Sequence, residues 1–226
     1  MNNISLTSLL MKKSFCILLA TLVQFSCREN NSNTLVGTDN TTEKVQLKPY
    51  AELKNDLKSF NGTTKEKQAR FFTFINSDVP DYWIGTKWDY NGTTRNPQNG
   101  TIACGYFVTT VLDDFGMKLK RIQLAQQVSS VMITTLCDSK SIKRFSSIEQ
   151  VEQYVNGRNS EEIYIVGLDF HTGFIIKDKA KMYFLHSNYI QKKGVVKEEL
   201  RHSKALLSSK SFMIGSLSEK EEHFKM

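Results

Sequence analysis

One cysteine followed by two histidines could perform thiol chemistry in this chain. Cys104 lies in Thr-Ile-Ala-Cys-Gly-Tyr-Phe-Val, a loop that leads into an apolar stretch of helical period, and His171 and His186 follow in two strand-like segments. A thiol at the start of a helix faces the positive end of the peptide dipoles, which favours the thiolate. An imidazole nearby could hold the proton, so this order of residues indicates a cysteine hydrolase.

The two histidines are predicted to be neighbours in a β-hairpin. Strand alternation places His171 and Gly173 on one face, where the glycine would leave space beside the imidazole. His186 ends the next predicted strand, so its ring could accept a hydrogen bond that fixes the tautomer of His171. Asn188 is a second candidate for this orienting role. Asp169 points to the same strand face as His171 and could tune its charge.

The remaining cysteines leave one alternative open. Cys137 ends the apolar sequence Met-Ile-Thr-Thr-Leu-Cys and is predicted to be a core residue, but outside the cytosol it could instead form a disulfide with Cys104. The sequence contains no Cys-x-x-Cys pair and no His-x-x-x-His spacing, so we predict neither a metal site nor a cofactor.

Helices are expected to position the thiol. A threonine cap at Thr63 predicts a helix that stops before Pro80. The period of apolar residues predicts a second helix over Gly105–Phe115, ended by Gly116, with Cys104 at its first turn. Two further helical stretches are predicted at about 124–134 and 147–157. Strand-like runs follow at 163–168, 171–176, 182–186 and 211–214. Helices first and strands later indicate an α+β domain with a mostly antiparallel sheet.

The N-terminal region reads as an export signal followed by a tether. Residues 1–26 contain no acid and carry an apolar run behind Lys12 and Lys13, with Met11 as a possible start. The run is too short for a spanning helix, and the signal ends in Ser26-Cys27, as in bacterial lipoprotein signals. We therefore predict a signal peptide at 1–26, lipidation of Cys27 with a flexible tether at 27–45, a hydrolase domain at 46–218 and a charged tail at 219–226. Plain secretion after Ser26 is the alternative.

Composition excludes several classes of protein. The 226 residues are 40% hydrophobic and 23% charged, which is typical of a globular chain, and nothing repeats at a fixed period. Removal of residues 1–26 would lower the net charge from +7 to +5, with 28 basic against 23 acidic side chains. This mild excess suits anionic envelope polymers or lipid head groups. No dense Lys/Arg run or aromatic-basic platform favours nucleic acid.

Four segments together resemble the NlpC-type cell-wall cysteine peptidases, which have a papain-like fold: Ile84–Gly92, Ala103–Val108, Gly116–Arg121 with Gln126, and His171–Ile175. The resemblance implies that Cys104 is the nucleophile, His171 its base and His186 the polar residue that orients the base. It also implies that Trp88 borders the site. Arg121 and Gln126 match a family segment for which a structural role is expected.

The chain departs from the family around the nucleophile. The family usually has Asp-Cys-Ser-Gly, whereas this chain has Ala-Cys-Gly-Tyr at 103–106, so the acid and hydroxyl that read a peptidoglycan stem peptide are missing. The predicted substrate-binding residues are Trp88, Tyr90, Gly105 and Asp169. The leading expectation is an envelope-anchored hydrolase of peptidoglycan or another peptide. The alternatives are a papain-fold amidase or acyltransferase acting on a lipid or small acylated molecule, and a non-catalytic envelope-binding lipoprotein.

Overall fold

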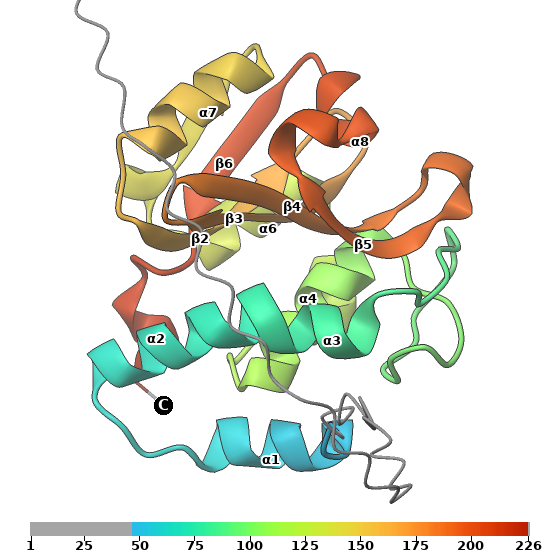
Figure 1. Cartoon of the computed structure of the whole chain (residues 1–226), viewed down its shortest axis with the longest axis vertical. Helices are drawn as coiled ribbons and strands as arrows, with labels where there is room; N and C mark the ends of the chain where they lie inside the picture. The colour runs from blue at the N-terminus through green and yellow to red at the C-terminus, as the bar shows by residue number, and fades with distance from the viewer. Residues whose placement is uncertain (1–46, 226) are drawn as a thin grey trace, which may run out of the picture. The chain divides into compact units, whose positions relative to one another are not determined.

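A single antiparallel sheet organises the described part of the chain, which is residues 47–225 of the computed structural model. The predicted signal peptide, Cys27 and the tether to residue 45 lie outside these residues. The sheet has six strands in the order β1-β6-β2-β3-β4-β5 (Figure 1). Their bounds are β1 Lys143–Phe145, β2 Glu161–Gly167, β3 Thr172–Asp178, β4 Lys181–Asn188, β5 Gly194–Glu199 and β6 Phe212–Ser216. The predicted α+β class with an antiparallel sheet is confirmed.

Helices cover both faces of the sheet, because the central strands are apolar on both sides. Side chains such as Ile165 and Phe174 pack against α2 (Thr64–Thr73), α4 (Cys104–Phe115) and α6 (Ser129–Leu136). The opposite side chains, among them Val166 and Ile175, pack against α7 (Ile148–Asn156) and α8 (Lys204–Leu207). Figure 1 shows α7 and α8 on one side of the strands and α2 and α4 on the other. A near-continuous apolar run is what a strand buried on both faces requires.

The first predicted helix has the expected start and a different end. Thr63 and Glu66 form a capping box at the start of α2, as the sequence indicated. The helix was expected to stop before Pro80, and this is wrong: a π-helical turn at Phe74–Asp78 leads directly into α3 (Val79–Trp83). Pro80 lies in the first turn of α3, where a missing N–H costs no helical hydrogen bond.

Other elements differ from expectation in extent. The stretch predicted as one helix at 124–134 is divided into α5 (Arg121–Ala125) and α6, with Val128 extended between them. α1 (Tyr50–Ser59), β1 and β5 were not predicted. β5 carries Val195 and Val196 followed by three charged residues, so its sequence has little strand-like alternation. Pairing with β4 stabilises it as a strand.

The charged tail expected at 219–226 belongs to the folded domain. Phe224 is 1% exposed and packs edge-on against Phe71 and Phe115. The Lys220 ammonium donates to the carbonyl of Thr135 at 3.0 Å. The predicted boundary at residue 218 is therefore wrong, because one buried aromatic ring attaches a segment whose charged composition suggested a solvated end.

Candidate functional site

Cys104 is the first residue of α4, as predicted. Ala103 precedes it in extended conformation, and Gly116 ends the helix with φ 109°. The thiol is half-buried, whereas most of the helix that follows it is fully buried. Cys104 and Cys137 are both free, so the proposed disulfide between them is wrong for this structure. The sulfur of Cys104 is thus not consumed by a disulfide in this structure.

Gly105 has a packing function rather than a substrate-facing one. A Cβ atom on this residue would lie 2.4 Å from the carbonyl oxygen of Ala125, closer than real contacts allow. The glycine lets α4 and α5 approach each other closely. Its predicted place among the substrate-binding residues is therefore corrected: the direction of its missing side chain points into α5 and not toward solvent.

His171 and His186 are hydrogen-bonded to each other. Nε2 of His171 lies 2.7 Å from Nδ1 of His186, and the two side chains are 4% and 0% exposed. The ring of His186 also stacks on Phe184, with ring centroids 4.0 Å apart. Gly173 makes this packing possible, since a Cβ there would lie 2.7 Å from the Cβ of His186. The sequence predicted that Gly173 leaves space beside the ring of His171. In the structure, His186 lies next to Gly173 instead.

Glu198 is the third member of a hydrogen-bonded chain that starts at His171 and continues through His186. Its carboxylate lies 3.1 Å from Nε2 of His186. The pKa of Glu198 is lowered below its ordinary value despite burial, because His186 and Ser203 hydrogen-bond to it, so the carboxylate is ionised and can only accept. His186 must then donate from Nε2 and accept at Nδ1, which requires His171 to donate from its own Nε2.

This chain of donors leaves one nitrogen of His171 as a bare acceptor. Nδ1 of His171 is buried and has no hydrogen-bond partner among the described residues. A buried polar atom without a partner is rare in folded proteins and calls for an explanation. A neutral imidazole with an open acceptor nitrogen is the form that a general base needs.

The thiol lies beside the residue that follows His171. Burial raises the pKa of the Cys104 thiol above its ordinary value, and hydrogen bonding with the backbone of Thr172 and Gly105 lowers it by a smaller amount. Helix position alone predicted a lowered thiol pKa, so the direction of the shift differs from expectation. Removal from water disfavours the thiolate more than the donors at the helix start favour it.

Burial also keeps the two imidazoles neutral. The pKa of His171 lies well below its ordinary value, first because of burial and second because of His186. The pKa of His186 is lowered by burial, with partial compensation from Glu198. The resting site therefore holds a neutral thiol and a neutral imidazole rather than an ion pair.

An aromatic wall borders the imidazole. The ring centroid of Tyr189 lies 5.1 Å from that of His171 and 6.5 Å from that of Trp88. The predicted placement of Trp88 near the site is consistent with these contacts. Tyr90 is 80% exposed and has no ring contact in the described part of the chain, so it stays a prediction. Phe170, directly before His171, is 92% exposed.

Two polar candidates near the histidines have other partners. The carboxylate of Asp169 accepts from the backbone N–H of Lys210 at 2.8 Å and from the hydroxyl of Ser211. These bonds hold the β2–β3 turn to the loop before β6, so Asp169 has a structural role in this structure. The side chain of Asn188 accepts from the backbone N–H of Ile190 at 2.8 Å, which leaves His186 as the residue that orients His171.

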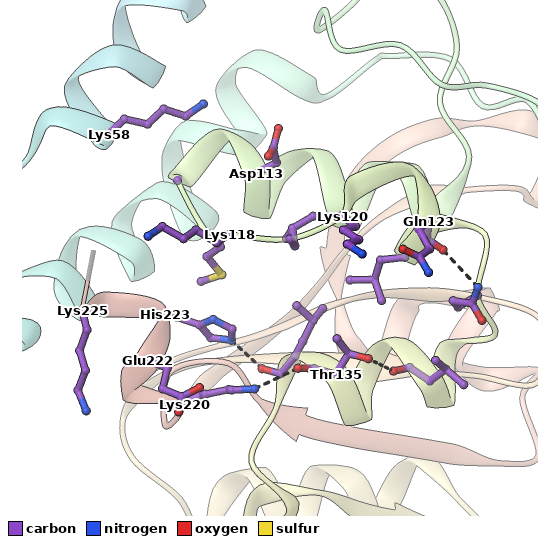
Figure 2. A pocket seen from close by; sticks show the side chains of 17 residues that line it. Lys58, Asp113, Lys118, Lys120, Gln123, Thr135, Lys220, Glu222, His223 and Lys225 are labelled. Carbon is purple, nitrogen blue, oxygen red and sulfur yellow. Dashed lines mark hydrogen bonds between the residues drawn. The ribbon is translucent and has the colours of Figure 1, made fainter.

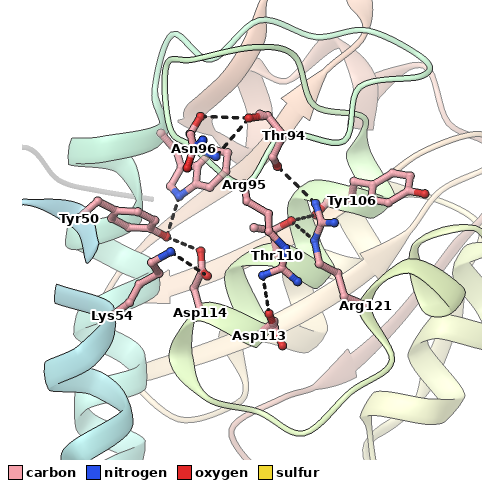
Figure 3. Close-up of polar contacts among 11 residues, drawn as sticks. Tyr50, Lys54, Thr94, Arg95, Asn96, Tyr106, Thr110, Asp113, Asp114 and Arg121 are labelled. Carbon is pink, nitrogen blue, oxygen red and sulfur yellow. Dashed lines mark hydrogen bonds and ion pairs between the residues drawn. The ribbon is translucent and has the colours of Figure 1, made fainter. Parts of the chain in front are cut away.

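Arg121 connects the loop that contains Thr93 and Thr94 to α4 (Figure 3). Its guanidinium donates to the hydroxyl of Thr110 and to the carbonyl of Thr93, both at 2.8 Å, and lies over the ring of Tyr106. Gln126 donates to the hydroxyl of Tyr106 at 3.2 Å. Arg121 and Gln126 therefore have the structural role that the sequence indicated.

Sequence reasoning missed Glu198 and Tyr189. Tyr189 directly follows Asn188, and its aromatic character beside a predicted turn was the only available signal. Glu198 is one of three consecutive charged residues in an unpredicted strand, so nothing in its local sequence distinguishes it. Its proximity to His186 depends on the register of β4 and β5, in which Phe184 pairs with Glu198 and His186 with Val196.

No family model, curated protein or solved structure matches this chain. Across residues 47–225, no group of three or more His, Cys, Asp or Glu side chains is arranged to hold a metal ion. Within the same range, no helix combines the length and apolar character needed to cross a bilayer.

Proposed function

We propose that this protein is a cysteine hydrolase that cleaves an amide bond through an acyl-enzyme, with Cys104 as nucleophile, His171 as base and His186 as the residue that orients the base. One observation carries the proposal. The hydrogen bonds from His171 through His186 to Glu198 fix both tautomers and leave Nδ1 of His171 open, next to the segment that contacts the thiol.

The reaction begins with proton transfer at Nδ1. Nδ1 of His171 accepts the thiol proton as the sulfur attacks the carbonyl carbon, and the carbonyl oxygen gains negative charge. The backbone N–H of Cys104 at the start of α4 is the donor we assign to this oxygen. Collapse of the tetrahedral intermediate breaks the C–N bond, and the imidazolium gives its proton to the leaving amine. A water molecule then hydrolyses the thioester, with His171 again accepting a proton.

Glu198 stabilises the transient imidazolium. When Nδ1 of His171 is protonated, the positive charge is shared through a hydrogen-bonded chain that ends at an ionised carboxylate. Low local polarity strengthens this interaction, because both rings are removed from water. If Cys104 and His171 are both neutral before the reaction, the imidazolium forms only as the sulfur attacks, and it needs stabilisation at that moment. In a preformed thiolate–imidazolium pair, the imidazolium would need stabilisation before the reaction as well.

Peptidoglycan stem peptides or other peptides are the first substrate class. The resemblance of four sequence segments to cell-wall cysteine peptidases supports this class, as does the predicted export signal with lipidation of Cys27, which would place the protein on the bacterial cell envelope. The second candidate is an amidase or acyltransferase of lipids or small acylated molecules. The aromatic wall of Trp88 and Tyr189, with exposed Phe170, favours an apolar acyl group at the site.

Two digestions separate these classes. The full chain is incubated with purified peptidoglycan and, separately, with a panel of N-acylated amines, and the products are identified by mass spectrometry, with the Cys104→Ala variant as control. New stem-peptide fragments that require Cys104 support the first class, and Cys104-dependent release of acyl products supports the second. Identical products from the variant in both digestions contradict the hydrolase proposal and favour a non-catalytic envelope-binding protein.

A further inference from the structure

A second site of interest is a cavity at the opposite end of α4 from Cys104. It has a volume of about 1220 Å³ and is bounded by the end of α4, the loop into α5, α6 and the C-terminal segment, with Lys58 of α1 at its rim (Figure 2). Cys104, His171 and His186 are not among its lining residues. The twelve residues of α4 separate the cavity from the thiol by roughly 16 Å.

Positive charge predominates around this cavity. Five ammonium groups line it against the two carboxylates of Asp113 and Glu222: Lys58, Lys118, Lys120, Lys220 and Lys225. Within the described part of the chain, the side chains of Lys118 and Lys120 form no ion pair or hydrogen bond, and both residues are exposed. Unpaired cations around a concave surface concentrate the positive potential inside it.

The floor of the same cavity is apolar. Met117, Leu124 and Leu136 are nearly buried there, and Val131 is 41% exposed. His223 does not add charge, because burial lowers its pKa more than the 2.7 Å hydrogen bond from its Nε2 to the carbonyl of Leu136 raises it. A ligand that satisfies both surfaces must carry an anionic group for the lysines and a hydrocarbon part for the floor.

We propose that this cavity binds an amphiphilic anion, a molecule with a phosphate head and a hydrocarbon chain. The ammonium groups of Lys118 and Lys120 contact the head group, and the chain lies along Leu124, Val131 and Leu136. This site is independent of the proposed hydrolase activity, since it shares no residue with the thiol site.

Calorimetric titration of the full chain tests the site. The probe is dodecyl phosphate below its micelle-forming concentration, compared with inorganic phosphate and with neutral dodecyl maltoside. Saturable binding of dodecyl phosphate is expected, with each comparison compound at least roughly tenfold weaker because it satisfies only one of the two surfaces. Equal affinity for inorganic phosphate would remove the apolar part of the proposal.

A matched pair of double variants separates the cavity from net charge. Lys118→Glu/Lys120→Glu should weaken dodecyl phosphate binding by roughly tenfold or more, through loss of two charge-assisted contacts. Lys140→Glu/Lys181→Glu changes the total charge equally at exposed lysines outside the cavity and should leave affinity within about twofold. Equal loss in both double variants, with both folded by circular dichroism, overturns the proposal.

Vesicles identify the source of the anion. Binding to phosphatidylglycerol vesicles that the cavity variant loses and the control variant keeps assigns the ligand to a bilayer lipid. Binding of monomeric dodecyl phosphate without vesicle binding assigns it to a free amphiphile. Absence of binding to both probes overturns the site.

Discussion

The two ends of α4 carry opposite kinds of site. At its start, the thiol of Cys104 contacts the backbone of Thr172, and His171, the residue before it, belongs to a buried pair of imidazoles whose hydrogen bonds end at one carboxylate. At its end, five lysine side chains surround a cavity with an apolar floor. A buried, hydrogen-bonded network defines one donor and one acceptor for proton transfer. Attraction of an anion requires charge at a surface, where water keeps the ammonium groups ionised.

Removal of the base should give the largest effect at the start of α4. His171→Ala is expected to lower Cys104-dependent hydrolysis of p-nitrophenyl acetate by about 10²- to 10⁴-fold, the usual contribution of a general base. Stopped-flow or steady-state absorbance measures the rate, and the thermal midpoint checks the fold. A folded variant with unchanged rate would show that His171 does not take the thiol proton.

Removal of the carboxylate should give a smaller effect. Glu198→Ala is expected to reduce the same rate by roughly 10- to 100-fold, as changes in groups that orient a site residue commonly do. Glu198→Gln keeps an oxygen that can accept from Nε2 of His186 and should retain more activity than the alanine variant. Equal rates for the two variants, or a loss confined to KM, would contradict the positioning role.

The packing of His186 can be tested by a pair of glycine substitutions. Gly173→Ala should lower the free energy of unfolding by about 1–3 kcal/mol, because the added Cβ would lie 2.7 Å from both His186 and Phe184. At Gly157 the nearest atom to an added Cβ is 3.6 Å away, so Gly157→Ala should change stability by less than about 1 kcal/mol. Urea unfolding measures both values, and similar losses in the two variants would show that the space beside His186 is not restricted.

The pH dependence of the thiol's reactivity should give the smallest effect. It is also the measurement that best distinguishes a neutral thiol from a preformed ion pair. Since burial raises the pKa of Cys104, its rate of alkylation by iodoacetamide should keep rising above pH 9, whereas a preformed ion pair would give a plateau near neutral pH. Because the pKa of His171 is lowered well below 6.5, the acid limb of the hydrolysis rate should lie below pH 6.5. Mass spectrometry of the modified peptide distinguishes Cys104 from Cys137, whose pKa burial raises to about 12. A plateau at neutral pH would restore the ion-pair description.

Much of the geometry of the candidate site was predictable because it depends on local periodicity. The helical period of Phe107, Val108 and Val111 fixed the start of α4 at Cys104, and Gly116 fixed its end. The hairpin that brings His186 to His171 follows from two apolar runs joined by a short turn at Asp178-Lys179. The sequence also indicated that Gly173 leaves space for an imidazole ring. It assigned this space to His171, whereas the structure places His186 there.

The contacts that the sequence did not predict share a different property: they join residues that are far apart along the chain. Gly105 faces a carbonyl in α5, Asp169 binds the loop before β6, and Phe224 enters a core formed by α2 and α4. Each of these contacts joins segments whose local sequences carry no information about one another. The prediction that a helix stops before Pro80 failed for a local reason. A π-helical turn can accommodate a residue that otherwise ends a helix.

The sequence by itself determined that Cys104 lies in the first turn of a helix and that two histidines meet across a hairpin, because both depend on side-chain period within one or two elements. Only the tertiary structure decided that Glu198 completes the hydrogen-bonded chain, that the thiol and imidazoles are neutral at rest, and that five lysines from three segments surround one cavity. Strand register and burial set these properties, and both arise from the packing of the whole domain.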